Sequence, residues 1–207
     1  MSISAAQGAT DRHDHPLAAE FEALRARGGG FGLIMADPPW RFATRSARGV
    51  TAKGAGGQYK TMSTDEIAAL PVQLLAATDC VLWLWVTNPM LPHGLRVLDA
   101  WGFDYRTHGT WAKLGKSGKL AFGTGYILRS AHETFLIGVR GTPRCTRSVR
   151  SAILAPRRQH SRKPDAAFEH AERLLPEARR IELFSRQRRP GWAAWGDEAG
   201  KFEGEAQ

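Results

Sequence analysis

The chain has 207 residues, a hydrophobic content of 43% and a formal net charge of +9 at pH 7. This length suffices for one domain with a sizeable core, and the hydrophobic content excludes a globally disordered chain. The longest strongly apolar run, Val81–Val86, is too short to span a bilayer, and the first residues lack the apolar segment of a signal peptide. We therefore expect a cytoplasmic protein with no membrane partner, and the positive charge favours nucleic acid as a partner.

The chain gives no sign of a disulfide framework or of a metal site. Cys80 and Cys145 are its two cysteines, and they have no C-x-x-C spacing. We expect both to be reduced and no metal to be bound. Residues 1–15 are small and polar and are predicted to be a disordered tail, followed by a single domain over residues 16–207.

The first predicted elements are a helix and a buried strand. Apolar residues at helical spacing predict a helix over residues 18–27, which three glycines at 28–30 end. Phe31–Ala36 is an unbroken apolar run, typical of a strand buried on both faces of a parallel sheet. The sequence Asp37-Pro38-Pro39-Trp40 ends this strand, because proline lacks the N–H donor that a sheet requires.

A basic, glycine-rich segment follows this turn. Residues 41–60 carry five basic side chains and no acidic one. We expect a substrate lid in which Arg41, Arg45 and Lys60 contact phosphates, with a solvated linker as the alternative. A capping-box pattern at Ser63 then predicts a helix that runs to Leu70.

The rest of the chain alternates strands with helices. We predict strands over residues 79–87, 103–114, 134–139 and 180–184, the second of them at an edge, and helices over 91–101 and 165–175. A basic, glycine-rich loop follows residue 114 and runs to about Tyr126. This order predicts an α/β fold: a three-layer sandwich with a mostly parallel sheet.

The turn at residues 37–40 is the candidate catalytic site. Open α/β sheets bind ligands at the carboxyl edge of their strands, where this turn must lie. The Asp37 carboxylate and the unpaired Pro38 carbonyl can each accept a hydrogen bond from an amine, and Trp40 offers a flat face for a base. The alternative is a structural turn in which Asp37 caps a helix and Trp40 fills the core. Asn88 also follows a strand and is expected near the same edge.

A second basic stretch lies in the later half of the chain. Eight basic residues and no acidic one stand between Glu133 and Asp165. We expect this stretch, which includes Arg157 and Arg158, to follow a phosphate backbone, although a solvated loop could have the same composition.

Taken in order, six segments of the chain resemble the MT-A family of DPPW-type adenine N(6)-methyltransferases. They are FGLIMADPPW, YKTMSTDEI, VLWLWVTNPML, HETFLIGVRG, RKPDAAFEHAERL and RRIELFSR, and the resemblance covers about residues 31–198. It implies a Rossmann-like fold in which the catalytic turn precedes the cofactor-binding strand. It also implies S-adenosylmethionine as methyl donor and the exocyclic amine of adenine as acceptor.

The resemblance also assigns residues to the two ligands. It implies that Asp37, Pro38, Pro39 and Trp40 form the catalytic turn and that Tyr59 lies beside the pocket. Cofactor contacts are expected from Asp37, His132, Glu182, Leu183, Phe184, Arg186, Arg188, Asp197 and Glu198. His132 stands where the family's messenger-RNA enzyme has a lysine. The implied mechanism is direct displacement on a base that has left its stack, without a metal or a covalent intermediate.

The polymer, the oligomeric state and the activity leave alternatives. The short chain resembles a bacterial or phage member, which favours DNA over RNA, and it could act as a monomer or a homodimer. An RNA adenosine methyltransferase and an inactive nucleic-acid-binding subunit are the alternatives, although an intact DPPW argues against the second. A methyltransferase of a small molecule or a protein amine is a third possibility, which the basic segments disfavour.

Overall fold

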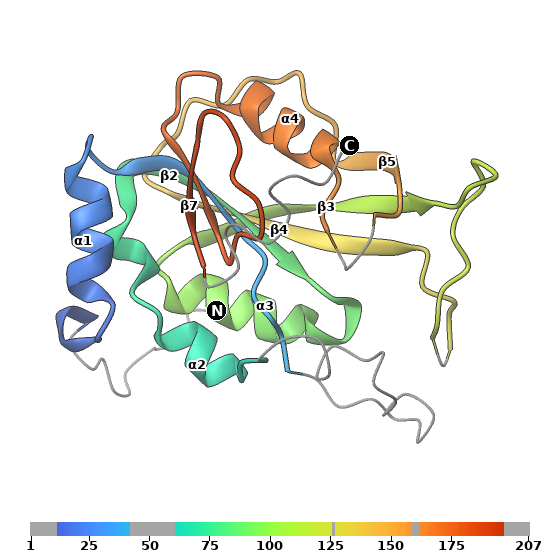
Figure 1. The fold of residues 1–207 in the computed structure, drawn as a ribbon, viewed down its shortest axis with the longest axis horizontal. Helices are drawn as coiled ribbons and strands as arrows, with labels where there is room; N and C mark the ends of the chain where they lie inside the picture. The colour runs from blue at the N-terminus through green and yellow to red at the C-terminus, as the bar shows by residue number, and fades with distance from the viewer. Residues whose placement is uncertain (1–11, 42–60, 126, 159–161, 197–207) are drawn as a thin grey trace.

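A central sheet with helices on both faces forms the body of the protein (Figure 1). The computed structural model describes residues 12–41, 61–125, 127–158 and 162–196. In this part of the chain the sheet has seven strands in the order β5-β3-β4-β2-β1-β6-β7. They are β1 (Phe31–Ala36), β2 (Ala76–Val86), β3 (Asp104–Leu114), β4 (His132–Arg140), β5 (Ala152–Pro156), β6 (Arg180–Leu183) and β7 (Trp192–Trp195).

Most neighbouring strands run parallel. β1 pairs in parallel with β2 and β6, β6 with β7, and β3 with β5, whereas β4 is antiparallel to both β2 and β3. The predicted α/β class and the mostly parallel sheet are confirmed. These strand directions determine which chain segments meet at the edge of the sheet where the site lies. That edge holds the carboxyl ends of β1, β2, β3, β5 and β6 and the start of β4.

The helices divide between the two faces of the sheet. α1 (Ala18–Ala26), α2 (Thr64–Ala69) and α3 (Leu91–Ala100) contribute Phe21, Ile67 and Leu98 to one core cluster. α4 (Asp165–Leu174) contributes Phe168 and Ala171 to a second cluster on the other face. Short 3-10 turns at Arg12–Asp14, Val72–Leu74 and Asn88–Met90 complete the described elements. These two clusters confirm the predicted three-layer arrangement.

Strand periodicity decides which core each strand residue joins. Successive side chains of a strand point to opposite faces. In β1, Ile34 and Ala36 belong to the cluster beneath α2 and α3, whereas Leu33 and Met35 belong to the cluster beneath α4. β1 is therefore buried on both faces, as its apolar run predicts.

Local signals placed the helix starts well. Ser63 caps α2 by accepting from the Glu66 N–H at 3.2 Å, and the Glu66 carboxylate accepts from the Ser63 N–H at 2.7 Å. This confirms the predicted capping box. α1, α3 and α4 also begin at their predicted residues and end within one residue of prediction.

Three predictions about the strands need correction. β3 was expected at an edge, but β5 pairs along its outer side. β5 itself lies inside the stretch expected to be a basic loop. It is only five residues long and is flanked by arginines, and its buried and exposed residues alternate. β7 comes from the aromatic segment 190–196, for which no strand was predicted.

Candidate active site

Asp37 lies at the carboxyl end of β1 and on the α4 side of the sheet. It comes two residues after Met35, whose side chain belongs to the core beneath α4. The carboxylate is 26% exposed. Its Oδ2 atom accepts a hydrogen bond from Lys163 Nζ at 2.7 Å. The sequence therefore holds a half-buried carboxylate at the sheet edge, paired with a lysine from a distant segment.

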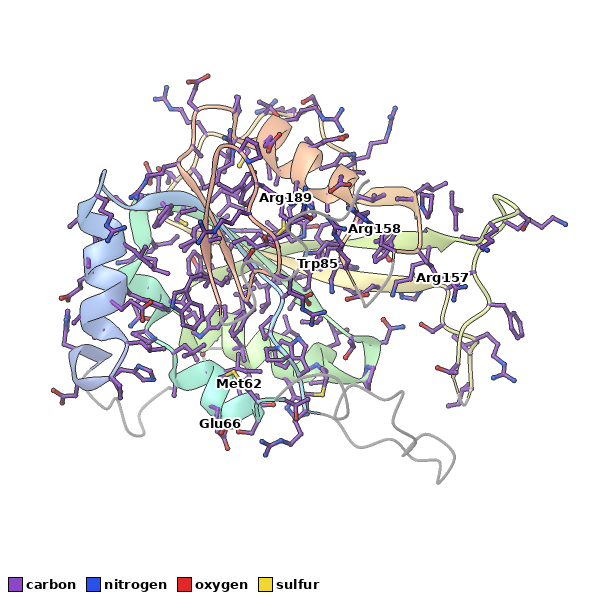
Figure 2. The ribbon with its side chains drawn as sticks, in the orientation of Figure 1. Met62, Glu66, Trp85, Arg157, Arg158 and Arg189 are labelled. Carbon is purple, nitrogen blue, oxygen red and sulfur yellow. The ribbon has the colours of Figure 1, made fainter. Side chains whose placement is uncertain are left out.

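The rest of the DPPW turn is more tightly bonded than the sequence suggests. The Pro38 carbonyl accepts from the Trp40 N–H at 2.8 Å, and the Pro39 carbonyl accepts from the Met62 N–H at 2.8 Å. The expectation of unpaired carbonyls was wrong, because residue 62 pairs with Trp40 as an isolated bridge. Figure 2 labels Met62 beside α2.

Trp40 packs into the core in this conformation. It is 4% exposed, and its indole N–H donates to the Trp85 carbonyl at 3.0 Å. The expectation that Trp40 offers a free face to a base is therefore corrected. The indole closes the core beneath the turn, which is the structural alternative considered from the sequence.

Asp37 is one end of a chain of four charged side chains. Lys163 Nζ also contacts Glu133 Oε1 at 2.8 Å, and Lys113 Nζ contacts Glu133 Oε2 at 2.8 Å. The side chains of Lys163 and Glu133 are only 6% and 10% exposed. The two lysines and the two carboxylates sum to zero charge. Asp37 accepts a hydrogen bond from Lys163, and Glu133 accepts one from Lys113. Such mutual neutralisation is the condition under which buried charges are tolerated.

The pKa shifts in this network follow from burial and pairing. Burial raises the pKa of Asp37, and the Lys163 cation opposes that effect. Burial also acts to raise the pKa of Glu133, but Lys163 and Lys113 outweigh it and the pKa is lowered. For Lys163, the two carboxylates outweigh burial and raise the pKa, so this lysine stays charged.

Two indoles lie beneath the lysines of this network. Lys163 Nζ is 5.3 Å from the centre of the Trp85 ring, and Lys113 Nζ is 4.8 Å from that of Trp111. Cations are attracted to the faces of aromatic rings at such distances. Trp85, Trp111 and Phe135 pack against one another in the core beneath α4. The two lysines of the network thus pack against the aromatic residues of this core.

A recess of about 370 Å³, part of it open to solvent, adjoins Asp37. Its walls combine carboxylates, cations and aromatic rings from the ends of β1 and β6, from α4 and the segment before it, and from the segment between β6 and β7. They are Asp37, Arg162, Lys163, Phe168, Glu182, Phe184, Arg186, Gln187 and Arg189.

The turn after β6 shapes one side of this recess. Phe184 has φ +60°, and it is the one non-glycine residue with positive φ in the described part of the chain. Such a conformation costs about 1–3 kcal/mol, and residues of this kind cluster at active sites and ligand-binding sites. Ser185 Oγ donates to Glu182 Oε2 at 2.8 Å, and the Ser185 N–H donates to the Trp195 carbonyl at 3.0 Å. Burial raises the pKa of Glu182 to about 7.

The structure brings together four of the predicted cofactor residues. Asp37, Glu182, Phe184 and Arg186 all line the recess. Leu183 does not, because strand periodicity turns its fully buried side chain into the opposite core.

Two further cofactor predictions meet a different placement. Arg188 is exposed and outside the recess, and its neighbour Arg189 lines it instead. His132 is likewise exposed and outside the recess, because Glu133 takes the inward position on β4. Asp197 and Glu198 lie outside the described residues.

Among the predicted substrate residues, the adjacent arginines Arg157 and Arg158 differ. Arg157 is exposed, and its N–H donates to the Leu114 carbonyl. Arg158 instead pairs with Asp165 at the start of α4, as does Arg189, which stacks on Phe168 at 3.8 Å. Figure 2 labels all three arginines. The phosphate contact of the exposed Arg157 stays a prediction, whereas the expectation of a free Arg158 side chain needs correction.

The other predicted substrate residues are less informative. Arg41 is exposed, donates to the Thr61 carbonyl at 3.2 Å and lies 3.7 Å from Glu66. Asn88 is exposed at the end of β2. Arg45, Tyr59 and Lys60 lie outside the described residues.

Sequence reasoning missed Lys163 and Glu133 as site residues. Lys163 was counted as one cation of a phosphate-binding stretch, but it is 7% exposed and bonded to two carboxylates. Glu133 stands two residues before buried Phe135 and Lys113 two residues after buried Trp111, so period-two alternation places both on the face that holds Asp37. This alternation in the sequence could have identified Glu133 and Lys113 as residues near Asp37.

Comparison with known proteins agrees with this geometry. The MT-A70 family model matches residues 31–198. The type II methyltransferase M.MunI of a Mycoplasma species is 30% identical over 182 residues, which are 79% of this chain and 76% of that protein. An MT-A70-like N(6)-adenosine-methyltransferase of Arabidopsis thaliana is 33% identical over 175 residues, 82% of this chain and 24% of that protein.

The human relative adds a second long protein. The N(6)-adenosine-methyltransferase catalytic subunit METTL3 is 31% identical over 176 residues, 82% of this chain. This chain thus spans only 24% and 28% of the plant and human proteins. In the described ranges, no helix is long and apolar enough to cross a membrane. The match over residues 31–198, together with the Asp37 site at the carboxyl edge of the sheet, shows that this chain belongs to the MT-A70 family of methyltransferases.

Proposed function

We propose that this protein transfers a methyl group from S-adenosylmethionine to the exocyclic N(6) amine of adenine in nucleic acid, most readily in DNA. The observation that carries this proposal is the Asp37 carboxylate, held by Lys163 at the rim of a mixed polar and aromatic recess. A carboxylate accepts hydrogen bonds and donates none when ionised, which suits an amine.

The recess offers a complement to each part of S-adenosylmethionine. Arg162, Arg186 and Arg189 would hold its carboxylate, and Asp37 its ammonium group. Glu182 has acceptor oxygens for the ribose hydroxyls, and Phe184 an aromatic face for the adenine. When bound, this cofactor would supply a methyl group on a sulfonium sulfur. Contacts from Asp197 and Glu198 remain predictions from the family resemblance.

Lys163 keeps Asp37 in the form that the reaction needs. Burial alone would favour the protonated acid, which donates one hydrogen bond instead of accepting. The cation at 2.7 Å opposes this burial effect and fixes Oδ2 of the carboxylate, so that Oδ1 would receive the adenine amine. Orienting the amine so that its lone pair faces the methyl group is a positioning effect, which can contribute several kcal/mol to a rate.

The relatives support DNA over RNA as the polymer. The match to the type II methyltransferase M.MunI spans most of both proteins. The proteins named N(6)-adenosine-methyltransferases, after the ribonucleoside, are matched over less than a third of their length. Exposed Arg157 at the site edge suits the phosphates of either polymer.

The test is methyl transfer from labelled S-adenosylmethionine to matched single- and double-stranded DNA and RNA oligonucleotides. Products are digested to nucleosides, so that the methylated atom is identified. We expect N(6)-methyladenine in DNA with the wild-type protein, and its loss in Asp37→Ala. Asp104→Ala is the matched control, since that carboxylate is 78% exposed on β3.

The results separate the alternatives. Methylation of RNA alone would move the assignment to an RNA adenosine methyltransferase. Methyl groups on another atom, or equal activity in Asp37→Ala, would refute the proposed chemistry. Binding of all four polymers without any transfer would indicate an inactive subunit.

A further inference from the structure

The segment that joins β3 to β4 carries an exposed apolar surface. We call residues 115–125 and 127–131 the finger; Figure 1 shows it extending beyond the sheet between the end of β3 and the start of β4. Leu120, Phe122, Ile127 and Leu128 are 62%, 79%, 88% and 82% exposed. Elsewhere in the described residues, exposed large apolar side chains stand singly or in pairs and are less exposed, apart from Leu154 on β5 at 67%. A cluster of this kind usually marks an interaction site.

The finger has a defined backbone structure. Gly115 N–H donates to the Lys119 carbonyl at 2.8 Å, and Ala121 N–H donates to the Lys113 carbonyl at 2.7 Å. Farther out, Gly123 N–H donates to the Ser130 carbonyl at 2.9 Å. These bonds hold the apolar side chains on a protruding scaffold instead of folding them into the core. Leaving a large apolar side chain in water forgoes its burial energy, which a binding partner would recover.

The charge of the finger identifies the kind of partner. Lys116, Lys119 and Arg129 are its charged residues, and residues 115–131 contain no acid. The Arg129 guanidinium lies 5.3 Å from the centre of the Phe122 ring. Apolar wedges flanked by cations are what proteins insert between base steps while they hold the adjacent phosphates.

The base of the finger lies directly beside the catalytic network. Lys113, two residues before the finger, contacts Glu133, which in turn contacts Lys163 beside Asp37. The exposed Arg157 is joined to the same place, since its N–H donates to the Leu114 carbonyl at 3.1 Å. A duplex that lay against the finger would therefore also reach the site edge.

We propose that the finger is a wedge that enters a nucleic-acid duplex beside the target adenine and stabilises the opened stack. This inference rests on the proposed function and adds to it the means by which a paired adenine leaves the helix. An adenine amine is not reachable inside a duplex, so the energy of unstacking must be supplied. Phe122, Ile127 and Leu128 are the wedge side chains, and Lys116, Lys119 and Arg129 hold the phosphates.

The experiment compares duplex and single-stranded substrates with a double variant, Phe122→Ser with Leu128→Ser. Both side chains are at least 79% exposed, so the change opens no cavity in the core. Single-strand turnover should stay within about twofold, because no stack has to be opened, whereas duplex kcat/KM should fall about tenfold or more. Leu95→Ser on α3 is the matched control, with a leucine that is 41% exposed.

A binding measurement tests the wedge independently of methyl transfer. A mixed-sequence duplex carries 2-aminopurine at alternate adenine sites, and its fluorescence rises when that base unstacks. The wild type and Leu95→Ser should raise the fluorescence, and the double variant should not. A wild type that methylates single strands but leaves duplex fluorescence unchanged would overturn the wedge while sustaining the proposed function. A rise in duplex fluorescence without methylation of any polymer would instead refute the proposed function and support the wedge.

Two further results would also overturn the proposal. Equal losses on duplex and single strands would show that the finger only binds the polymer or supports the fold. A wild-type dimer in light scattering that becomes monomeric in the double variant, with an unchanged ratio of duplex to single-strand activity, would assign the finger to a second copy of this chain.

Discussion

At the scale of single residues, Lys163 and its two carboxylates decide what Asp37 can do. Burial raises the pKa of Asp37 and so favours the protonated acid, which is the poorer acceptor, and the Lys163 cation opposes this effect through one contact at 2.7 Å. In making this contact, the Lys163 side chain is almost completely buried. Breaking a buried ion pair on one side leaves the other charge uncompensated, so the network is sensitive to each of its members.

Replacing Lys163 by Met should impair both stability and activity. Asp37 and Glu133 would become neighbouring carboxylates without their shared cation, at a cost of about 3–5 kcal/mol in denaturant unfolding. Their pKa values would rise, so activity at pH 7 should fall and recover in part at higher pH, in a profile of kcat/KM against pH. Arg27→Met, an exposed cation, is the control. If the low-pH side of the kcat/KM profile were the same in Lys163→Met as in the wild type, the role given to Lys163 would be contradicted.

Glu182 should make folding stability depend on pH. Its pKa is raised from 4.5 to about 7 in the folded chain, so the native state binds the extra proton. This contribution is fully present below about pH 4.5 and is lost as the pH rises through about 7, on the order of 3 kcal/mol. Glu182→Gln should remove that slope from unfolding free energies measured across this range. Exposed Glu177→Gln should keep it, and equal slopes in both variants would refute the assignment.

The residue-level chemistry was predictable only where a residue lies within a strand or directly after one. Asp37 and Glu182 belong to strand patterns that are clear in the sequence, and both line the recess. Lys163 comes from a segment 126 residues after Asp37, and no local pattern distinguishes it from the arginines around it. The packing of Trp40 also depends on the Trp85 carbonyl, which only the folded sheet brings near.

At the scale of elements, local signals determine the ends of helices, and pairing determines the ends of strands. The capping box at Ser63 and the glycines after α1 act within one turn, so the sequence was sufficient there. β5 is short and alternates Ile153 and Ala155 inward with Leu154 outward between arginines, so its strand character depends on pairing with β3. That pairing also moves β3 away from the edge.

Removing the cap of α2 should have a small and local effect. Ser63→Ala loses the hydrogen bond to the Glu66 N–H and should cost about 1 kcal/mol of stability, seen as a lower denaturant midpoint with an unchanged slope. Ser63→Asp should restore most of it, because a carboxylate also accepts at this position. A loss in both variants alike would show that the hydroxyl acts through another contact.

At the scale of the whole molecule, the net charge of +9 should make polymer binding depend on salt. Each neutralised phosphate makes the slope of log affinity against log salt concentration steeper by about 0.9 on duplex DNA and about 0.7 on single strands, because condensed counterions are released. Arg157→Gln should therefore reduce the slope by about one unit. Arg158→Gln should leave the slope nearly unchanged and lower stability instead, since Arg158 is bound to Asp165. Equal slopes in both variants would contradict this division.

The topology explains why a catalytic centre can be assembled from distant segments. Because β4 runs against β2 and β3, its start at Glu133 meets the ends of β3 and β1 at one edge. Alternation along each strand then points Lys113, Glu133 and Asp37 to the face that α4 covers. Fold class followed from the order of helices and strands, whereas this convergence required the pairing order of the whole sheet.

The most direct test of the account is the rate of the methyl-transfer step in wild type and Asp37→Asn. It is measured in a single turnover on an adenine-containing DNA oligonucleotide, with S-adenosylmethionine binding followed in parallel. Asparagine retains the shape of the side chain but loses the charge and one acceptor, so we predict a rate at least about a hundredfold lower at saturating S-adenosylmethionine, with donor binding weakened but still measurable. A rate within about threefold of wild type would contradict the central role of Asp37.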